Sequence, residues 1–391
     1  MTDSHKFIPY GRQTVTQADI DAVINVMKSE YLTQGPMVPC FENAVAKKVN
    51  VKHGIVTNSA TSALHIACIA LGLRPGDRLW TSPITFVASA NSARYCGAEV
   101  DFVDIEPKTG LMCTERLEKK LEIASKEGKL PKVVMPVHLC GTSCAMQTIR
   151  GLADKYGFKV LEDASHAIGG KYQQQPIGSC QYSEISVFSF HPVKIITTGE
   201  GGIATTNDRL LARRMSDLRC HGITKDSTRF EQATPGPWSY EQQELGFNYR
   251  MNEMQAALGL SQLQRIEAII AERQRLHERY KALLANLPVQ LLHVPADVSS
   301  SLHLAVIRLK NSTKQHHKFV FEKLRAANIG VQLHYTPVHL QPYYRRLGFK
   351  INDFPNAEEY ATNAISLPIY PGLNEHDLKY IVDTLTSILK S

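Results

Sequence analysis

The chain has 391 residues, of which 43% are hydrophobic, and a formal net charge of +7 at pH 7. This length and hydrophobic content allow a large buried core and suggest one large domain with a smaller one. The modest charge comes without a concentrated basic run, which argues against a nucleic-acid-binding protein and is compatible with an anionic substrate.

The sequence indicates neither a membrane-spanning segment nor a metal site. The first twelve residues are polar and no apolar run is long enough to span a bilayer, so we expect a cytoplasmic protein with no signal peptide. The eight cysteines are scattered without zinc-type pairing, and we therefore expect reduced thiols and no metal.

Helical and strand-like patterns alternate along the first half of the chain. Apolar residues at helical spacing predict helices over residues 17–27, 39–48, 62–71, 87–95, 115–124 and 145–155. Short apolar runs between and after them predict strands over residues 54–57, 77–82, 99–103, 132–137, 158–162 and 185–190. Repeated βα units with short loops predict an α/β fold, with a mostly parallel central sheet covered by helices.

The second half of the chain predicts a smaller α+β domain. A long helical pattern over residues 252–285 leads away from the first region. We expect a strand over residues 302–309 after it, then helices over residues 316–327 and 375–389. The predicted division is a large domain of residues 1–260, including the N-terminal segment, and a C-terminal domain of residues 261–391.

One lysine stands out in this pattern. Lys194 follows the predicted strand over residues 185–190, in a proline-broken loop before a glycine-rich turn. An amine held in this way can form a Schiff base with a carbonyl compound. A loop lysine can equally be a solvated surface charge, so the catalytic interpretation needs partners.

Asp163 is the first possible partner. It ends the predicted strand over residues 158–162, and the carboxyl end of a parallel strand faces the crevice where α/β sheets bind ligands. A carboxylate there could keep the pyridine nitrogen of pyridoxal phosphate (PLP) protonated, as that cofactor's chemistry requires. The alternative is that Asp163 caps a following helix.

The second possible partner is a run of small residues, Asn58-Ser-Ala60-Thr61-Ser62, which opens a predicted helix directly after a strand. Small residues at a helix start leave backbone N–H groups bare, and these groups together with the helix dipole can bind a phosphate. Ordinary helix capping by serine and threonine explains the same residues.

A lysine, an aspartate and a phosphate cradle at three strand ends resemble the fold-type I PLP-dependent aminotransferases. Three longer segments are similar to the DegT/DnrJ/EryC1 family of nucleotide-sugar aminotransferases: Ser189-Phe-His-Pro-Val-Lys194 with the following Thr-Thr-Gly-Glu-Gly-Gly, Asn58-Ser-Ala-Thr-Ser-Ala-Leu64, and Gly246-Phe-Asn-Tyr-Arg250-Met. The resemblance covers nearly the whole chain. It departs at Ser59-Ala60, where many members carry Asn-Gly; alanine can still donate its N–H if its φ angle is negative.

The resemblance implies a role for each matching residue. Lys194 would hold PLP as a Schiff base and serve as the base that moves protons, while Asp163 would bind the ring nitrogen. The other expected cofactor contacts are the stacking ring of Phe86, His166 beside the ring hydroxyl, the phosphate donors Ala60, Thr61 and Ser189, and Asn248 reaching in from a neighbouring subunit. The active site would then belong to a homodimer.

Within the family the resemblance is strongest to the transaminases of pseudaminic acid biosynthesis. It implies that UDP-2-acetamido-2,6-dideoxy-β-L-arabino-hex-4-ulose, a 4-keto sugar, is aminated with L-glutamate as the donor. The expected sugar contacts are Tyr10, Glu30, Tyr31, Leu32, Thr33, Gln332, Leu333, His334 and Tyr335. Such residues, mostly with polar side chains in loops, suit sugar hydroxyls but could equally be ordinary loop residues.

Other interpretations stay open. A related aminotransferase could act on a different keto sugar. A dehydratase of the same fold would carry histidine in place of Lys194, and a DNA-binding regulator would need a basic arm or reading helix that the sequence lacks.

Overall fold

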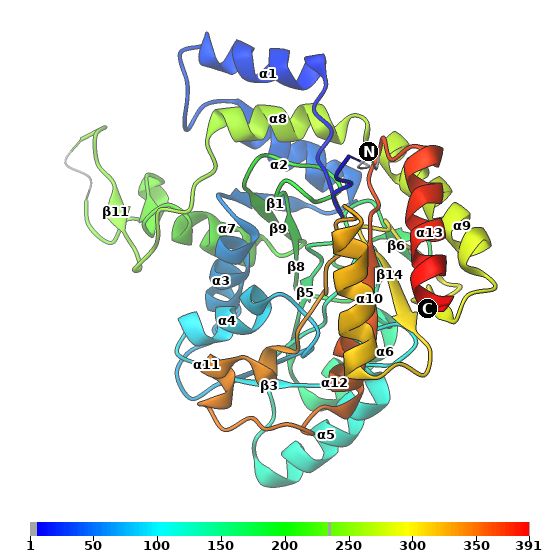
Figure 1. Ribbon diagram of the computed structural model, residues 1–391. Coiled ribbons are helices and arrows are strands. Elements are labelled where there is room, and N and C mark those ends of the chain that lie inside the picture. The colour runs from blue at the N-terminus through cyan, green and yellow to red at the C-terminus, as the bar shows by residue number, and fades with distance from the viewer. Residues whose placement is uncertain (1–5, 234–235, 391) are drawn as a thin grey trace.

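The computed structural model describes residues 6–233 and 236–390, and a seven-stranded sheet forms its centre (Figure 1). The strands lie in the order β1-β9-β8-β5-β4-β2-β3. Their bounds are β1 His53–Thr57, β2 Arg78–Thr81, β3 Glu99–Phe102, β4 Val133–Met135, β5 Lys159–Asp163, β8 Ile185–Ser189 and β9 Gly202–Thr206. The predicted α/β class with a mostly parallel, helix-covered sheet is confirmed.

Six of these strands run in one direction. β2 pairs in parallel with β3 and β4, β4 pairs with β5, and β5 pairs with β8. β9 is antiparallel to both β8 and β1, so β1 runs the same way as β8. The carboxyl ends of the six strands therefore meet at one edge of the sheet, where ligands bind in folds of this kind.

The predicted helices around this sheet are all present and differ from their predicted bounds by at most three residues. They are α1 Gln17–Met27, α2 Met37–Lys48, α3 Ala60–Ala70, α4 Val87–Tyr95, α5 Thr114–Glu127 and α6 Met146–Tyr156. Helix α7, Arg209–Leu218, was not predicted, although Asp208 caps it by accepting from the N–H groups of Leu210 and Leu211.

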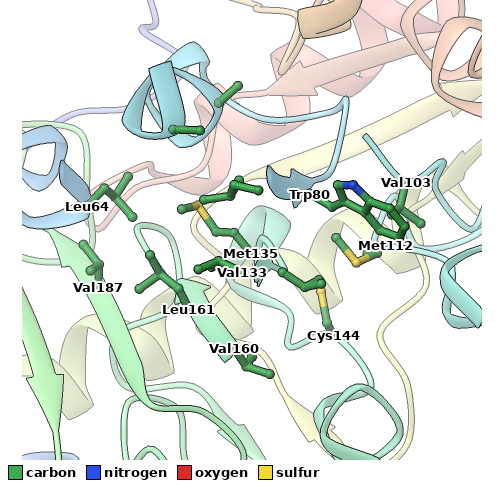
Figure 2. Packing of buried hydrophobic residues seen from close by; sticks show 14 of the residues in the cluster. Leu64, Trp80, Val103, Met112, Val133, Met135, Cys144, Val160, Leu161 and Val187 are labelled. Atoms are coloured by element: carbon green, nitrogen blue, oxygen red, sulfur yellow. The ribbon is translucent and has the colours of Figure 1, made fainter. Parts of the chain in front are cut away.

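The core of the large region lies on both faces of the sheet. Trp80, Met135, Leu161 and Val187 from four neighbouring strands belong to one cluster with Leu64 from α3, and Figure 2 shows this cluster extending from Leu64 and Val187 at one side to Trp80 at the other. All five side chains are buried, and β4 and β8 are buried along their whole length. This pattern explains why the strands read as continuous apolar runs, since a parallel sheet is covered on both faces.

The long helix predicted over residues 252–285 is wrong as a single element. It is two helices, α8 Glu253–Leu263 and α9 Ile266–Leu284, because Arg265 leaves helical geometry with φ −111° and ψ 16°. Arg265 forms a salt bridge with the buried Asp19 of α1, to which Ser261 and Gln262 also donate. These tertiary interactions with α1 thus interrupt the helix. The domain boundary predicted between residues 260 and 261 would fall within α8, and it stays a prediction.

The C-terminal part contains a three-stranded antiparallel sheet in the order β12-β14-β15. Its strands are β12 Val289–Leu291, β14 Ala305–Leu309 and β15 Ala364–Leu367, with helices α10 Lys314–Ala326 and α13 Glu375–Lys390 beside it (Figure 1). β14 begins three residues later than predicted, after Leu302 with a left-handed φ of 54°. The short helices α11 Pro342–Arg345 and α12 Pro355–Ala361 were not predicted.

The remaining elements are short. They are strands β6 Lys171–Tyr172, β7 Gln175–Pro176, β10 Ile223–Thr224, β11 Glu241–Gln242 and β13 Val298–Ser299, and 3-10 helices at Leu139–Gly141, Ser227–Arg229 and Val338–Leu340. The segment that carries β11 projects from the body of the molecule (Figure 1).

Gly202, at the start of β9, allows this strand to pack closely against the start of α3. A Cβ atom on Gly202 would lie 2.5 Å from both the nitrogen and the Cα of Ala60. We therefore expect Gly202→Ala to lower stability by about 1–3 kcal/mol through overpacking, measured by denaturant unfolding. Gly151→Ala in α6 is the control, because nothing lies within 4 Å of the place that its added methyl group would take. Equal stability of the two variants would show that β9 and α3 can separate freely.

Candidate active site

A cavity of about 920 Å³ opens at the edge of the sheet where the parallel strands end. Residues at or just after the ends of five strands line it: Asn58 after β1, Thr85 after β2, Val137 after β4, Asp163 in β5 and Ser189 in β8. Lys194 and the segment Gln332–Thr336 complete much of its wall. The predicted catalytic residues are thus brought together from distant parts of the chain.

Lys194 lies in the loop between β8 and β9. Its backbone N–H donates to the carbonyl of His191 at 2.9 Å, which tightens the loop just before the lysine side chain. Burial lowers the pKa of the Lys194 amine to about 8, although the negative charge of Asp163 opposes the shift. An amine with this pKa is half unprotonated at about pH 8, and the unprotonated form can act as a nucleophile or base.

Asp163 ends β5, near the middle of the sheet, and is 5% exposed. Its Oδ2 accepts from the Ser89 hydroxyl at 2.6 Å, and its Oδ1 accepts from the Ser165 backbone N–H at 3.1 Å. No α-helix begins after it within the described residues 164–208, so helix capping does not explain this carboxylate. Two donors therefore satisfy this buried carboxylate and fix its orientation.

The start of α3 forms the predicted cradle. Ser59 is indeed a cap, since its side chain accepts from the N–H of Ser62 at 3.1 Å. The N–H groups of Ala60 and Thr61, both on the cavity wall, have no acceptor among the residues the structure describes. Ala60 is the first helical residue and its φ is negative, so alanine serves here as glycine would. Capping and an anion site coexist in this turn.

His166 is a buried, neutral residue with a defined tautomer. The backbone N–H of Cys140 donates to its Nδ1 at 3.3 Å, so the ring proton lies on Nε2. Nε2 is 3.2 Å from the hydroxyl oxygen of Tyr335. Burial, followed by the charge of Lys194, holds the pKa of His166 well below its ordinary value, so the ring donates a hydrogen bond without carrying charge.

The C-terminal segment supplies the opposite wall. Gln332, Leu333, His334 and Tyr335 line the cavity together with Tyr10, as predicted, and the rings of Tyr10 and His334 lie 5.2 Å apart. His334 accepts or donates at Nδ1 with the Ser366 hydroxyl at 2.8 Å, and burial is the main reason why its pKa falls to about 3. This wall therefore presents neutral polar groups to a ligand.

Five other predicted site residues do not line the cavity of this chain. Glu30, Tyr31, Leu32 and Thr33 are exposed on the connection between α1 and α2. Asn248 is also exposed, and it forms a β-bridge with Cys220. Both residues belong to the projecting arm, which we define as residues 219–233 and 236–250 (Figure 1). Their roles stay predictions, and for Asn248 the predicted role is in the active site of a neighbouring subunit.

Several residues of the cavity wall were missed by sequence reasoning. Thr85, which lines the cavity, was missed, and so was Ser89, which is buried beside it and does not line the cavity. Their spacing of four residues places them about one helical turn apart, on either side of Phe86, which is 60% exposed at the cavity. His303 was also missed. Its ring lies 4.4 Å from the ring of His166, and no local sequence pattern predicts that contact. Contacts of this kind depend on tertiary structure.

The cavity fits PLP on each side. Unpartnered backbone N–H groups at a helix start and the Ser189 hydroxyl suit its phosphate, Asp163 suits the ring nitrogen, and Phe86 presents an aromatic face. Among residues 6–233 and 236–390, no group of three or more histidine, cysteine or acidic side chains could hold a metal ion. In the same described part of the chain, no helix is both long and apolar enough to cross a membrane.

Comparison with known proteins decides the family. Residues 13–386 match the DegT/DnrJ/EryC1/StrS aminotransferase family. The chain belongs to this family. It is 37% identical over 384 residues to the UDP-4-amino-4,6-dideoxy-N-acetyl-beta-L-altrosamine transaminase of Campylobacter jejuni, covering 98% of each chain. It is 35% identical over 388 residues to the spore coat polysaccharide biosynthesis protein SpsC of Bacillus subtilis, covering 98% of this chain and 97% of that protein.

A solved structure agrees over the same length. The chain superimposes on Helicobacter pylori PseC, an aminotransferase involved in the biosynthesis of pseudoaminic acid, with a TM-score of 0.90 and 31% identity, covering 98% of this chain and all of that one. Aminotransferases of this family use PLP, and the chain is a PLP-dependent sugar aminotransferase that acts on a nucleotide sugar.

The lowered pKa of Lys194 predicts the pH dependence of cofactor loading. The unprotonated amine is the reactive form, so the rate at which cofactor-free protein reacts with added PLP should rise with pH and level off above about pH 8. An unperturbed lysine would give a rate that still rises near pH 10. Stopped-flow absorbance across this pH range distinguishes the two, and continued rise above pH 9 would contradict the burial argument.

Proposed function

We propose that this enzyme converts UDP-2-acetamido-2,6-dideoxy-β-L-arabino-hex-4-ulose to the corresponding 4-amino sugar, with L-glutamate as the amino donor, in pseudaminic acid biosynthesis. The observation that carries the proposal is the full-length similarity to transaminases named for that product, at 37% and 36% identity. The similarity to PseC over the whole chain supports it.

The residues of the cavity support the chemistry of an amino transfer. When bound, PLP supplies the electron sink that stabilises a carbanion at the donor carbon. The Lys194 amine, with its lowered pKa, takes the proton from the α-carbon of the donor and returns a proton to C4 of the sugar. Asp163 would hold a proton at the ring nitrogen, and its two hydrogen-bond donors fix its carboxylate in position. Because one lysine serves both half-reactions, ping-pong kinetics follow.

The sugar side of the proposal depends on Tyr10 and the segment Gln332–Tyr335. These residues line the cavity and offer amide, imidazole and phenol groups, which suit the hydroxyl and acetamido groups of an N-acetyl sugar. Burial and the Asp163 charge raise the pKa of the Tyr335 phenol, so this residue stays a neutral donor and acceptor. The remaining predicted sugar contacts, residues 30–33, would be supplied around a subunit interface.

We propose further that the enzyme is a homodimer with a shared active site. Asn248 is exposed on the projecting arm and does not reach the cavity of its own chain. The arm also exposes Trp238 by 75%, Tyr240 by 60% and Leu245 by 81%. A second copy that covered these side chains could receive Asn248 at its phosphate cradle, as the family resemblance implies.

Covalent labelling tests the role of Lys194. Purified protein loaded with PLP should be yellow, and borohydride should fix the cofactor to Lys194, as identified by peptide mass spectrometry. Lys194→Ala should reduce transamination by at least about 10²-fold, since a positioned proton-transfer group contributes on this order. Lys159→Ala is the control, because Lys159 is exposed at the opposite end of β5 from Asp163. Labelling of another residue would overturn the assignment.

Substrate preference tests the sugar. The enzyme should aminate the L-arabino 4-keto sugar faster than a UDP-linked 4-keto sugar of D configuration, with glutamate as the donor in both assays. The ratio of kcat/KM is the measurement. A preference for the D-configured sugar would contradict the pseudaminic assignment and indicate a nucleotide-sugar aminotransferase of the family with another substrate. The labelling result at Lys194 would be unaffected.

A further inference from the structure

Asp163 is joined to a short chain of buried hydroxyl groups that starts after β2. Thr85 Oγ1 lies 2.6 Å from Ser89 Oγ, which in turn lies 2.6 Å from Asp163 Oδ2. Ser89 is fully buried and Thr85 is 3% exposed. The three groups therefore satisfy one another away from bulk solvent.

The order of donors in this chain follows from counting protons. Ser89 has one hydroxyl proton, and the strongest acceptor within its reach is the Asp163 carboxylate, compared with the Phe86 carbonyl at 3.3 Å. Once that proton is committed, Ser89 can only accept from Thr85. Thr85 thus donates to Ser89 and Ser89 donates to Asp163, and each bond strengthens the next.

The backbone adds to the same effect. Ser89 lies in the first turn of α4, whose N-cap is Phe86, so Asp163 is bonded to the positive end of the helix dipole. One helical turn therefore carries both the aromatic ring exposed at the cavity and the donor to the carboxylate. A shift of this turn would displace both groups together.

We propose that Ser89, oriented by Thr85, is a positioning residue that fixes the Asp163 carboxylate in the position from which it would bind the ring nitrogen of PLP. A carboxylate buried to this extent carries a large desolvation cost, which donors to its oxygens offset. Of the two donors to Asp163, the Ser165 N–H belongs to the backbone, so Ser89 is the one that a side-chain substitution removes. The inference depends on the use of PLP and not on the identity of the sugar.

The test is PLP affinity rather than turnover. Ser89→Ala should raise the Kd for PLP roughly tenfold or more, because it removes a charge-assisted bond, and should move the visible absorption band of the bound cofactor toward that of Asp163→Asn. Ser89→Thr keeps the hydroxyl and should restore both. Ser92→Ala is the matched control, since Ser92 is fully buried in the same helix but donates to the Ser89 carbonyl instead.

A double-mutant cycle separates positioning from general packing. In an Asp163→Asn background, Ser89→Ala should change the Kd by no more than about twofold, because the bond then joins neutral groups. An equal loss of affinity in both backgrounds, with the melting temperature of the cofactor-free protein lowered, would reduce Ser89 to a packing residue and overturn the proposal. Wild-type affinity and absorption in Ser89→Ala would overturn it as well. Both readouts are independent of which sugar the enzyme accepts.

Discussion

A partly buried amine and a buried carboxylate share one cavity, and the rest of the site is arranged around this pair. Burial lowers the pKa of the Lys194 amine to about 8, although the negative charge of Asp163 opposes the shift. Asp163 is held in place by two hydrogen bonds, from the Ser89 hydroxyl and the Ser165 backbone N–H. The amine can therefore give up its proton at about pH 8, while the carboxylate is fixed in position beside it.

The sheet topology makes this arrangement possible. Asp163 and the loop of Lys194 follow two adjacent parallel strands, β5 and β8, so they emerge side by side at one edge. β9 then returns antiparallel between β8 and β1 and brings Gly202 against the start of α3. The glycine has no side chain, and the close contact it permits fixes the phosphate cradle relative to the lysine loop. The packed apolar core beneath the edge holds the strands in register (Figure 2).

Sequence reasoning succeeded where chemistry and local pattern coincide. Asp163 ends a strand, and Lys194, Ala60 and Thr61 follow strands by three to five residues, so the alternation of strands and helices was enough to predict that they would converge. It failed where the local structure depends on a residue that is distant in sequence but close in the folded chain. The break between α8 and α9 depends on Asp19, which is distant in sequence, and the contact of His303 with His166 spans two regions of the chain. β9 was missed because its glycine start indicates a turn, and only pairing with β1 and β8 makes it a strand.

The cavity of one chain contains only part of the predicted site, and this division indicates how the site is assembled. Asp163, suited to the ring nitrogen, and Lys194, suited to catalysis, come from a strand end and the following loop of one chain and are buried or partly buried. Five predicted contacts, residues 30–33 and Asn248, are exposed outside the cavity. Buried groups at strand ends can be oriented by one fold, whereas exposed loop residues need a surface to order them. The proposed homodimer accounts for this division, because the apolar side chains exposed on the arm would be covered by the same contact that orders Asn248. The cofactor chemistry would then depend on residues in the interior of each subunit. The phosphate side of the site would be completed only when two subunits associate.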